Sequence, residues 1–403
     1  MRVAVPLEVK AGEKRVALVP DIINKLTRLG YEVVIQSGAG DNSQGSDAAY
    51  AAAGASVVKG DVLAGADVVL SVQPLTPAQM ATLKSGAITI SFLSTVTAVD
   101  SIDAAIKAGV TAFSLELVPR ISRAQSMDAL TSQALCAGYR AVLVGAELSP
   151  RFFPMLMTAA GTVTPAQVLV LGAGVAGLQA IATARRLGAV VSAYDVRPAS
   201  ADEVRSMGAT FIELELESLE GSGGYAREMT EDRAAKQRDL LTPYIAKSHI
   251  VITTAAVPGR QAPRLMTQAM VDSMGPGTVI VDLAAETGGN VEGSKPGEIV
   301  ITSGGVKIWG GKDVPSQLPF HASQLFSRNC LNLLMLMIKT EEGNTSIALD
   351  FEDEIIRETL KSVINVKEIQ VKNGERGMHR YIISNSDTVE DVMNVFEGMT
   401  RHL

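Results

Sequence analysis

Short apolar runs alternate with segments of helical spacing along the N-terminal part of the chain. Apolar runs of strand length fit buried strands, and the amphipathic segments between them fit helices. Pro20 suits a helix start and Gly30 a left-handed helix end. The expected strands are 2–6, 31–36, 67–73 and 87–92, and the expected helices are 21–30, 46–55 and 77–86. This alternation predicts a mostly parallel sheet covered by helices on both faces.

A second set of strands begins after Pro165. Its apolar runs lie within 167–174, 189–195, 249–255 and 277–284, with a helix at 175–188. We therefore predict an α/β protein with two Rossmann-like, doubly wound parallel-sheet domains and a cofactor cleft between them. An apolar helix at about 321–339 is expected to return to the first domain. The predicted domains are 1–133 plus 320–356, then a second Rossmann-like domain at 134–319, with 357–403 as a C-terminal extension of no assigned role.

Two segments break the alternation. The acidic, glycine-rich stretch 216–236 has no strand pattern and is predicted to be a mobile surface loop with Tyr225 near its tip. In the tail after Phe351, the pattern indicates a hairpin with an Asn373-Gly374 turn, followed by a capped helix.

Composition excludes several kinds of partner. The net charge is −7 and no basic run occurs, which argues against nucleic acid. The apolar stretch 330–338 has about half the length of a membrane crossing, so no direct span is expected. The N-terminus lacks the features of a signal peptide, which indicates a cytosolic chain. Cys136 and Cys330 fit buried, reduced thiols, and no metal site is expected.

The sequence QVLVLGAGVAGLQA carries the chemistry of a dinucleotide site. An apolar strand leads into Gly172, Gly174 and Gly177, whose roles are a tight turn, backbone approach to a pyrophosphate, and close helix packing. The first helical residues, Val175 and Ala176, would offer N–H groups to the pyrophosphate. Asp195 follows the next strand at the spacing typical of a ribose-binding carboxylate.

These residues favour NAD over NADP, because the charge of Asp195 repels a 2′-phosphate. Arg197 keeps NADP open as an alternative, since an arginine at this position can bind the 2′-phosphate. Val196 and Arg197 complete the predicted ribose segment. A glycine turn without a ligand is the other alternative. No nucleophile motif is present, and the four histidines (His249, His321, His379, His402) lack metal-ligand spacing. The sequence thus offers a cofactor site without an evident acid or base.

Several motifs together resemble the NAD(H)-binding component of proton-translocating nicotinamide nucleotide transhydrogenase. They are RISRAQSMD before the GAGVAG turn, YDVRP at the ribose, GSGGYAREM in the glycine-rich loop, and HASQLFSRNCLNLL afterwards. The resemblance covers about 1–356. The N-terminal VPLEVKAGEKRVALVP is shared with alanine dehydrogenase and does not separate the two.

Three positions separate them. Gln73 stands where alanine dehydrogenases carry an oxo-acid-binding lysine, Ser94 and Thr95 lie in the segment of the catalytic histidine, and Glu286 stands where those enzymes typically have aspartate. Arg15 is retained, but without the lysine and histidine nothing polarises or protonates a carbonyl substrate. The second substrate is then expected to be another nicotinamide nucleotide.

The resemblance assigns catalytic alignment to Arg120, Gln125, Asp128 and Thr131. Hydride transfer between two nicotinamides requires rings held close and in register. Arg120 could pair with Asp128, while Gln125 and Thr131 could bind the carboxamide or ribose. The other interpretation is a polar connection that caps a helix, for which Ser122, Asp128 and Thr131 are usual residues.

The resemblance also implies further cofactor contacts and partners. Tyr225 beside Gly224 would close over bound nucleotide, and Ala255, Ala256 and Val257 would line the nicotinamide. The remaining implied contacts are Ile121, Ser122, Arg123 and Gln237. In this family the component forms a homodimer at the cytoplasmic face of the inner membrane, where it docks on a membrane-spanning component and an NADP(H)-binding component. A soluble alanine-type amino-acid dehydrogenase and a non-catalytic NAD(H)-sensing module remain the alternatives.

Overall fold

The structure is a computed structural model that describes residues 1–94, 97–216, 230–256, 261–341 and 344–360. The described chain forms two compact units. The first unit comprises Met1–Ala129 and the described residues from Ser323 onward, and the second comprises Leu130–Ala322.

The first unit is built on a six-stranded sheet in which every pairing is parallel. Its strand order is β3-β2-β1-β4-β5-β6. The strands are β1 (Arg2–Val5), β2 (Glu32–Gln36), β3 (Ser56–Val58), β4 (Val68–Leu70), β5 (Ile88–Ser91) and β6 (Thr111–Ser114). The helices between them are α1 (Pro20–Thr27), α2 (Asp47–Ala52), α3 (Pro77–Met80) and α4 (Val99–Ala108).

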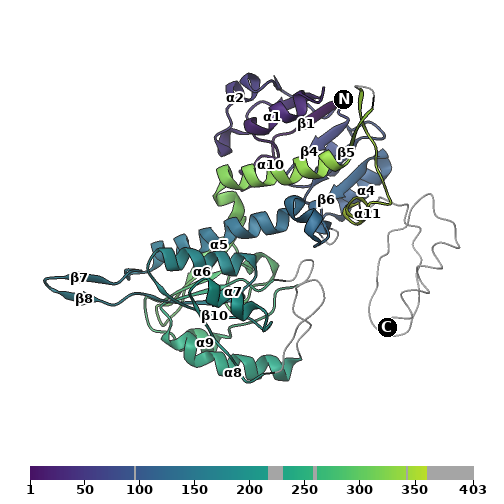
Figure 1. Ribbon diagram of the computed structural model, residues 1–403. Helices are drawn as coiled ribbons and strands as arrows, with labels where there is room; N and C mark the ends of the chain where they lie inside the picture. The colour runs from purple at the N-terminus through teal and green to yellow at the C-terminus, as the bar shows by residue number, and fades with distance from the viewer. Residues whose placement is uncertain (95–96, 217–229, 257–260, 342–343, 361–403) are drawn as a thin grey trace, which may run out of the picture. The chain divides into compact units, whose positions relative to one another are not determined.

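Alternating strand residues bury opposite faces of this sheet. Val3 and Val5 pack with α1, whereas Ala4 packs with α3 and α4. The period of two in side-chain direction explains the division, because neighbouring residues of a strand point to opposite faces. The first face also receives α10 (Pro319–Leu336) and α11 (Glu354–Thr359), through buried side chains such as Phe326 and Ile355. Helix α10 (green in Figure 1) thereby returns to the first unit, as the sequence predicts.

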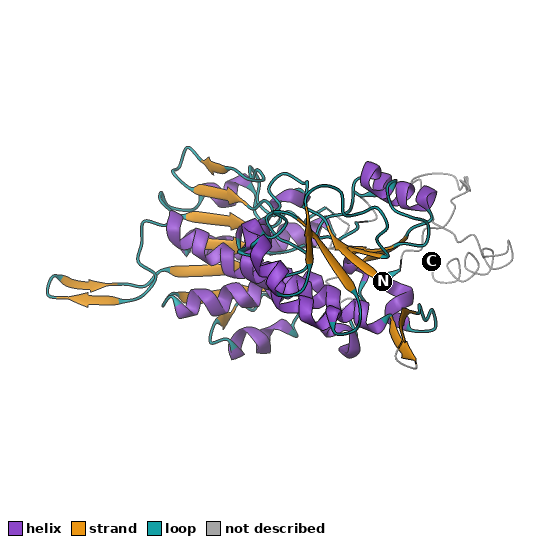
Figure 2. Ribbon diagram, turned by 90° about the horizontal axis from the view of Figure 1, so that it is seen from above, coloured by secondary structure: helices purple, strands orange, loops and turns teal. Residues whose placement is uncertain are grey.

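The second unit contains a seven-stranded sheet with the order β11-β10-β9-β12-β13-β15-β14. Figure 2 shows its strands side by side, and β14 alone runs antiparallel to its neighbour. The strands are β9 (Gln167–Leu171), β10 (Val190–Tyr194), β11 (Thr210–Phe211), β12 (Ile250–Thr253), β13 (Val279–Asp282), β14 (Ile299–Ile301) and β15 (Lys307–Gly310). The helices are α5 (Ala129–Leu148), α6 (Val175–Arg186), α7 (Ser200–Ser206), α8 (Glu231–Lys247) and α9 (Gln268–Asp272).

Helices cover both faces of the second sheet. One face packs on α5, α6 and α7, and the other packs on α8 and α9. The predicted Rossmann-like, doubly wound α/β architecture is therefore confirmed in each unit. In each sheet the chain starts at a central strand, moves outward on one side and then crosses to the other, which places a topological switch point beside β1 and beside β9.

Several local predictions were wrong. The expected strand 67–73 ends at Leu70, because the N–H groups of Val72 and Gln73 donate to the Glu8 carboxylate instead of extending the ladder. Helix α10 ends at Leu336, where the chain turns into the hairpin β16 (Ile338–Glu341) and β17 (Asn344–Ile347).

Two polar segments also hold helical structure, and in the second of them a connection that caps a helix was one of the two interpretations left open. The end of the predicted loop 216–236 begins α8 at Glu231, with acidic residues in the first helical turn where they favour the helix dipole. Residues Ser122–Met127 form a 3₁₀ turn, and Thr131 lies in the first turn of α5. The predicted loop tip at Tyr225 and the tail beyond residue 360 lie outside the described residues.

No helix in the described part of the chain combines the length and hydropathy that a membrane crossing requires. Cys136 and Cys330 are both free and buried, as predicted. A further hairpin, β7 (Leu156–Thr158) with β8 (Gly161–Val163), extends away from the seven-stranded sheet (Figure 1) and was not predicted.

Candidate functional site

The glycine turn of the second unit joins β9 to α6 in the way that the sequence predicts. Gly172 has a φ of +101°, in the left-handed region that favours glycine. A Cβ atom on Gly177 would lie 1.9 Å from the Gly172 carbonyl oxygen, so helix and turn are in contact only because that residue is glycine. Gly174 caps α6 without a side chain, and a Cβ there would meet nothing within 4 Å.

This geometry fits a dinucleotide pyrophosphate. The first N–H groups of a helix have no partner within the helix, and they attract phosphate together with the helix dipole. The open space above Gly174 admits the phosphate to those groups. Val175 and Ala176 form the first helical residues, as expected.

A second glycine, which sequence reasoning missed, holds the start of α6. A Cβ on Gly138 in α5 would lie 2.1 Å from the Ala176 carbonyl oxygen, so two helix backbones meet there. The signal in the sequence is weak, because Gly138 sits inside a helix with no turn around it.

Asp195 lies at the carboxyl end of β10, where its carboxylate faces the glycine turn. Its Oδ2 accepts the Ala173 N–H at 2.7 Å and an Nη2–H of Arg197 at 3.0 Å. Its Oδ1 accepts both the backbone N–H and the Nε–H of Arg197 at 2.9 Å. A carboxylate has about four acceptor positions, and all are in use. A ribose that binds Asp195 must therefore exchange with the Arg197 guanidinium.

The end of β12 lies beside the same turn. The Thr254 hydroxyl donates to the Gly172 carbonyl at 3.0 Å. The amide of Asn290, which is fully buried, binds both main-chain groups of Ala255 at 3.0 and 2.8 Å and the Pro263 carbonyl at 2.8 Å. Asn290 thus fixes the segment predicted to line the nicotinamide. Ala256 is exposed, and Val257 lies outside the described residues.

Gln237 has a contact in the protein core. It is 2% exposed, and its Oε1 accepts the hydroxyl hydrogen of Tyr194 at 2.9 Å. Burial raises the pKa of Tyr194 to about 12, so this phenol stays a donor at neutral pH. The geometry supplies a packing role for Gln237, and its predicted role at the cofactor stays a prediction.

The predicted alignment residues belong to a polar segment at the start of α5. Arg120 and Gln125 are exposed, while Asp128 and Thr131 are half-buried. Ile121 precedes the 3₁₀ turn, and Ser122 begins it. Arg123 forms a bidentate ion pair with Asp353 at 2.7 and 3.0 Å. Two asparagines of α10, Asn329 and Asn332, each donate to the Ser126 carbonyl at 3.0 Å. Sequence reasoning missed these three supporting residues.

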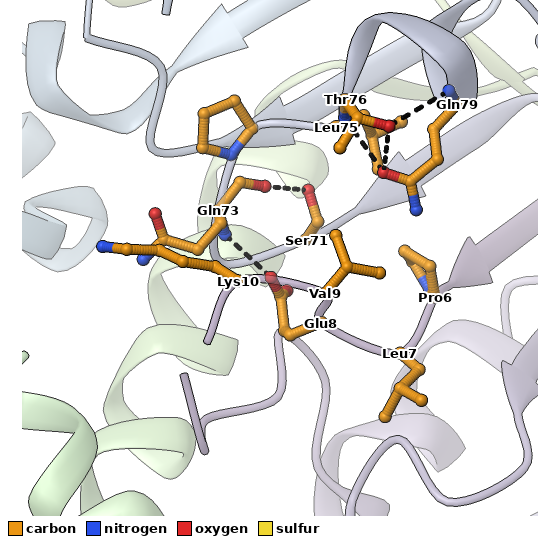
Figure 3. Close-up of a pocket in the computed structure, with 11 residues that line it drawn as sticks. Pro6, Leu7, Glu8, Val9, Lys10, Ser71, Gln73, Leu75, Thr76 and Gln79 are labelled. Atoms are coloured by element: carbon orange, nitrogen blue, oxygen red, sulfur yellow. Dashed lines mark hydrogen bonds between the residues drawn. The ribbon is translucent and has the colours of Figure 1, made fainter. Parts of the chain in front are cut away.

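A cavity of about 330 Å³ lies in the first unit, at the carboxyl ends of β1 and β4. Glu8, Ser71 and Gln73 line it, and Figure 3 shows their side chains gathered there. Gln73 donates to Glu13 Oε2 at 2.7 Å, and the Ser71 hydroxyl donates to the Gln73 carbonyl at 2.7 Å. The polar groups of this wall are therefore bound to one another.

Two carboxylates beside the cavity have opposite pKa shifts. Burial raises the pKa of Glu8 to about 7, although the N–H groups of Val72 and Gln73 act against it. Burial also disfavours the charge of Glu13, but the hydrogen bond and charge of Arg15, with the bond from Gln73, lower its pKa to about 2. Glu13 and Arg15 form a buried ion pair at 2.6 Å.

The groups of this network that could bind an oxo acid are already engaged. The Arg15 guanidinium is bound by Glu13 through Nε and Nη2 and lies 5.9 Å from the centre of the Phe92 ring. Ser94 accepts the Thr97 N–H at 3.3 Å, and Thr95 lies outside the described residues. In the second unit, separate from this network, Glu286 accepts the Asp313 N–H at 2.9 Å.

Comparisons with known proteins agree with this arrangement. Residues 4–137 match the model for the N-terminal domain of alanine dehydrogenase/PNT, and residues 141–373 match the model for the C-terminal domain. The chain is 47% identical over 369 residues to an NAD(P) transhydrogenase subunit alpha chain of Rhodospirillum rubrum, covering 89% of this chain and 95% of that protein. It is 35% identical to alanine dehydrogenase of Mycobacterium tuberculosis, over 73% of this chain and 76% of that one.

A solved transhydrogenase structure also matches this chain. The crystal structure of transhydrogenase from Sinorhizobium meliloti matches with a TM-score of 0.76 and 45% identity, covering 84% of this chain and 94% of that one. The sequence identity is higher to the transhydrogenase proteins, at 47% and 45%, than to the alanine dehydrogenase of Mycobacterium tuberculosis, at 35%. The chain therefore belongs to the alanine dehydrogenase/PNT family, and within it to the alpha subunits of NAD(P) transhydrogenase.

Proposed function

We propose that this chain binds NAD(H) at the Gly172 turn and exchanges hydride directly with NADP(H) held by a partner component. A membrane-spanning component of the same complex would couple this transfer to proton translocation. When bound, NADH would supply a hydride, with both electrons, from its C4 and become NAD⁺. NADP⁺ would accept this hydride at its own C4 and become NADPH. The protein then has to bind the nucleotide, align its nicotinamide ring and exclude water.

One observation supports this proposal most directly. The dinucleotide turn is complete, whereas the wall that carries Gln73 is closed by internal hydrogen bonds and the charge of Arg15 is already paired with Glu13. A nucleotide can bind at such a turn, but an oxo acid would have to break the Arg15–Glu13 pair before its carboxylate could bind Arg15. The second substrate is therefore a nucleotide brought by another protein.

The residues proposed to hold NAD(H) are assigned in part from the glycine turn and in part from the family resemblance. The Gly172–Gly177 turn and the start of α6 bind the pyrophosphate, and Asp195 binds the ribose after exchange with Arg197. The peptides of Ala255 and Ala256 lie beside the turn at the nicotinamide side. From the resemblance we propose that Arg120, Gln125, Asp128 and Thr131 align the ring; the predicted role of Tyr225 falls outside the described residues.

We also propose that the chain works as a homodimer at the cytoplasmic face of the inner membrane. The β7–β8 hairpin and the residues that lead into it support the dimer, because five apolar side chains are exposed together within this short stretch. The exposed fractions are 61% for Phe152, 57% for Met155, 37% for Leu156, 78% for Met157 and 40% for Val163. The name "subunit" in the relatives supports a multi-component complex.

Activity with and without a partner tests the proposal. Purified chain mixed with an NADP(H)-binding transhydrogenase component should reduce an NADP analogue with NADH. The same chain without a partner should leave NADH unoxidised across a panel of oxo acids. Turnover of an oxo acid without a partner would establish the amino-acid dehydrogenase, and binding without either activity would establish an NAD(H)-sensing module.

A further inference from the structure

The segment that carries the predicted alignment residues is anchored by its apolar positions. In the Ser122–Met127 turn, Ala124 and Met127 are buried in the core of the first unit. Gln125 and Ser126 are exposed. These two buried side chains fix where the turn sits, and the Asp128 N–H donates to the Gln125 carbonyl at 3.3 Å, while the orientation of the Ser126 carbonyl is set by side chains. The polar contacts around the turn decide that orientation.

The first polar contact comes from α10. Asn329 and Asn332 are three residues apart, so they lie on one face of the helix. Their Nδ2 atoms both donate to the Ser126 carbonyl oxygen at 3.0 Å. A carbonyl has two lone pairs, so this oxygen is fully bound. The peptide after Ser126 is planar, and its orientation is set by α10 at the position next to Gln125.

The second contact comes from the residue that precedes α11. The Asp353 carboxylate accepts hydrogen bonds from both terminal nitrogens of Arg123, from Nη1 at 2.7 Å and from Nη2 at 3.0 Å. It also accepts the Ile355 N–H at 2.8 Å as the N-cap of α11, so its own position is fixed by a helix. The Arg123 side chain is 53% exposed, and an exposed pair adds little to stability. A bidentate pair does restrict orientation strongly.

We infer that Asn329, Asn332 and Asp353 are positioning residues for hydride transfer, which hold the Arg120–Thr131 segment in register from α10 and α11. This inference rests on the proposed function. Asn329 and Asn332 hold the segment at Ser126, and Asp353 holds it at Arg123. All three residues follow the second unit in the sequence. None of the three has to touch the cofactor.

The test separates alignment from binding and from stability. Asn332→Asp keeps the shape of the side chain but removes its donor, and it is half-buried, so the fold should tolerate it. Asp353→Asn keeps the N-cap acceptor of α11 and removes the charged pair. The matched control is Arg328→Gln, an exposed change on the same helix, whose side chain forms no hydrogen bond or ion pair with Asn329, Asn332 or Asp353 among the described contacts. Each full-length variant is mixed with the NADP(H)-binding component.

Three quantities are measured for each variant: the Kd for NADH, the single-turnover rate of hydride transfer to an NADP analogue, and the Tm. In the double variant N332D/D353N we expect NADH affinity within about threefold of wild type and a transfer rate lower by about tenfold or more, because a misplacement of about 1 Å can cost about a hundredfold. Arg328→Gln should match wild type in all three.

Other results overturn the inference. A lower Tm with an unchanged transfer rate would make the contacts purely structural. Equal losses of NADH affinity and transfer rate in the double variant would mark the clamp as part of the binding site. A loss of affinity in Arg123→Gln that Asp353→Asn does not share would make Arg123 a direct cofactor contact. A wild-type chain that binds NADH but transfers no hydride would instead refute the proposed function. Should the double variant not fold, the single variants carry the same comparison.

Discussion

Asp195 illustrates how a predicted binding residue can be occupied in the free protein. Its carboxylate holds the Ala173 N–H of the glycine turn and is covered by Arg197 on its remaining positions. Sequence reasoning treated Arg197 as a residue that could admit a 2′-phosphate. In the structure its guanidinium is paired with Asp195, and a ribose that binds Asp195 would displace it, so the choice between NAD and NADP stays a prediction.

Removal of the Asp195 carboxylate should weaken NADH binding and its selectivity together. For Asp195→Ala we expect a loss of affinity of about tenfold, since hydrogen bonds to a charged group contribute about 1.5–3 kcal/mol. The ratio of NADH to NADPH affinity should fall in the same variant, because the charge that repels a 2′-phosphate is lost. Fluorescence titration with both nucleotides measures this. An unchanged ratio would remove Asp195 from the ribose site.

Glu8 gives a prediction about pH. Its pKa is raised by burial from 4.5 to about 7, so the folded protein binds this proton more tightly than the unfolded chain. The stability contributed by the protonated form is present below pH 4.5 and is lost as pH rises to about 7. Glu8→Gln is neutral at every pH, so the Tm of wild type relative to this variant should fall between pH 5 and pH 8.

Glu13 is a control for that experiment, because its pKa is lowered to about 2 and it keeps its charge over the same range. Its contribution to stability is present above pH 4.5 and is lost only as pH falls towards 2. A difference in Tm between wild type and Glu8→Gln that stays constant from pH 5 to pH 8 would show that Glu8 titrates normally.

At the scale of single residues, the sequence predicted those whose chemistry depends on local spacing. The glycines of the turn and Asp195 are examples, because a strand, a turn and a helix define their surroundings. Asn290, Gly138 and Asp353 could not be predicted. Each acts through a partner that is far away in the chain, such as Ala255 for Asn290 or Arg123 for Asp353.

At the scale of elements, the turn between β9 and α6 offers a matched pair of substitutions. Gly174→Ala places a methyl group in open space at a permitted φ of −75°, so the fold should be retained. The same methyl group occupies the approach to the pyrophosphate, and NADH affinity should drop by about tenfold or more. Gly177→Ala instead forces a Cβ to within 1.9 Å of the Gly172 carbonyl oxygen and should lower the Tm.

Thermal unfolding and NADH titration of both variants distinguish the two roles. Loss of affinity at unchanged Tm in Gly174→Ala, with a clear drop of Tm in Gly177→Ala, is the expected pattern. Wild-type affinity in Gly174→Ala would show that no phosphate approaches the backbone there.

The elements themselves were predicted well where apolar period and turn residues agree. Helix α1 begins at Pro20, and Gly30 follows it with a φ of +82°. The errors lie where a tertiary contact replaces a local one, as with Glu8 at the end of β4. The hairpin β7–β8 could not be predicted from the sequence. Its apolar residues would suggest a place in the core, but in the described unit they are exposed.

At the scale of the whole molecule, that hairpin bears on assembly. Met157→Glu places a charge on a side chain that is 78% exposed, so the fold of one chain should be unaffected. If the hairpin packs against a second copy, the buried charge should weaken the homodimer by about tenfold or more. Sedimentation equilibrium of wild type and variant tests this. An unchanged dimer, with wild-type circular dichroism, would place the interface elsewhere.

We propose that hydride passes directly from NAD(H) on this chain to NADP(H) on a partner. This transfer is tested most directly with NADH that carries deuterium at the transferred C4 position, incubated with the chain, the NADP(H)-binding component and NADP⁺. Direct transfer predicts deuterium at C4 of the NADPH formed, with none released to water. Deuterium in the solvent, or unlabelled NADPH, would show that the hydride does not pass directly between the two nucleotides.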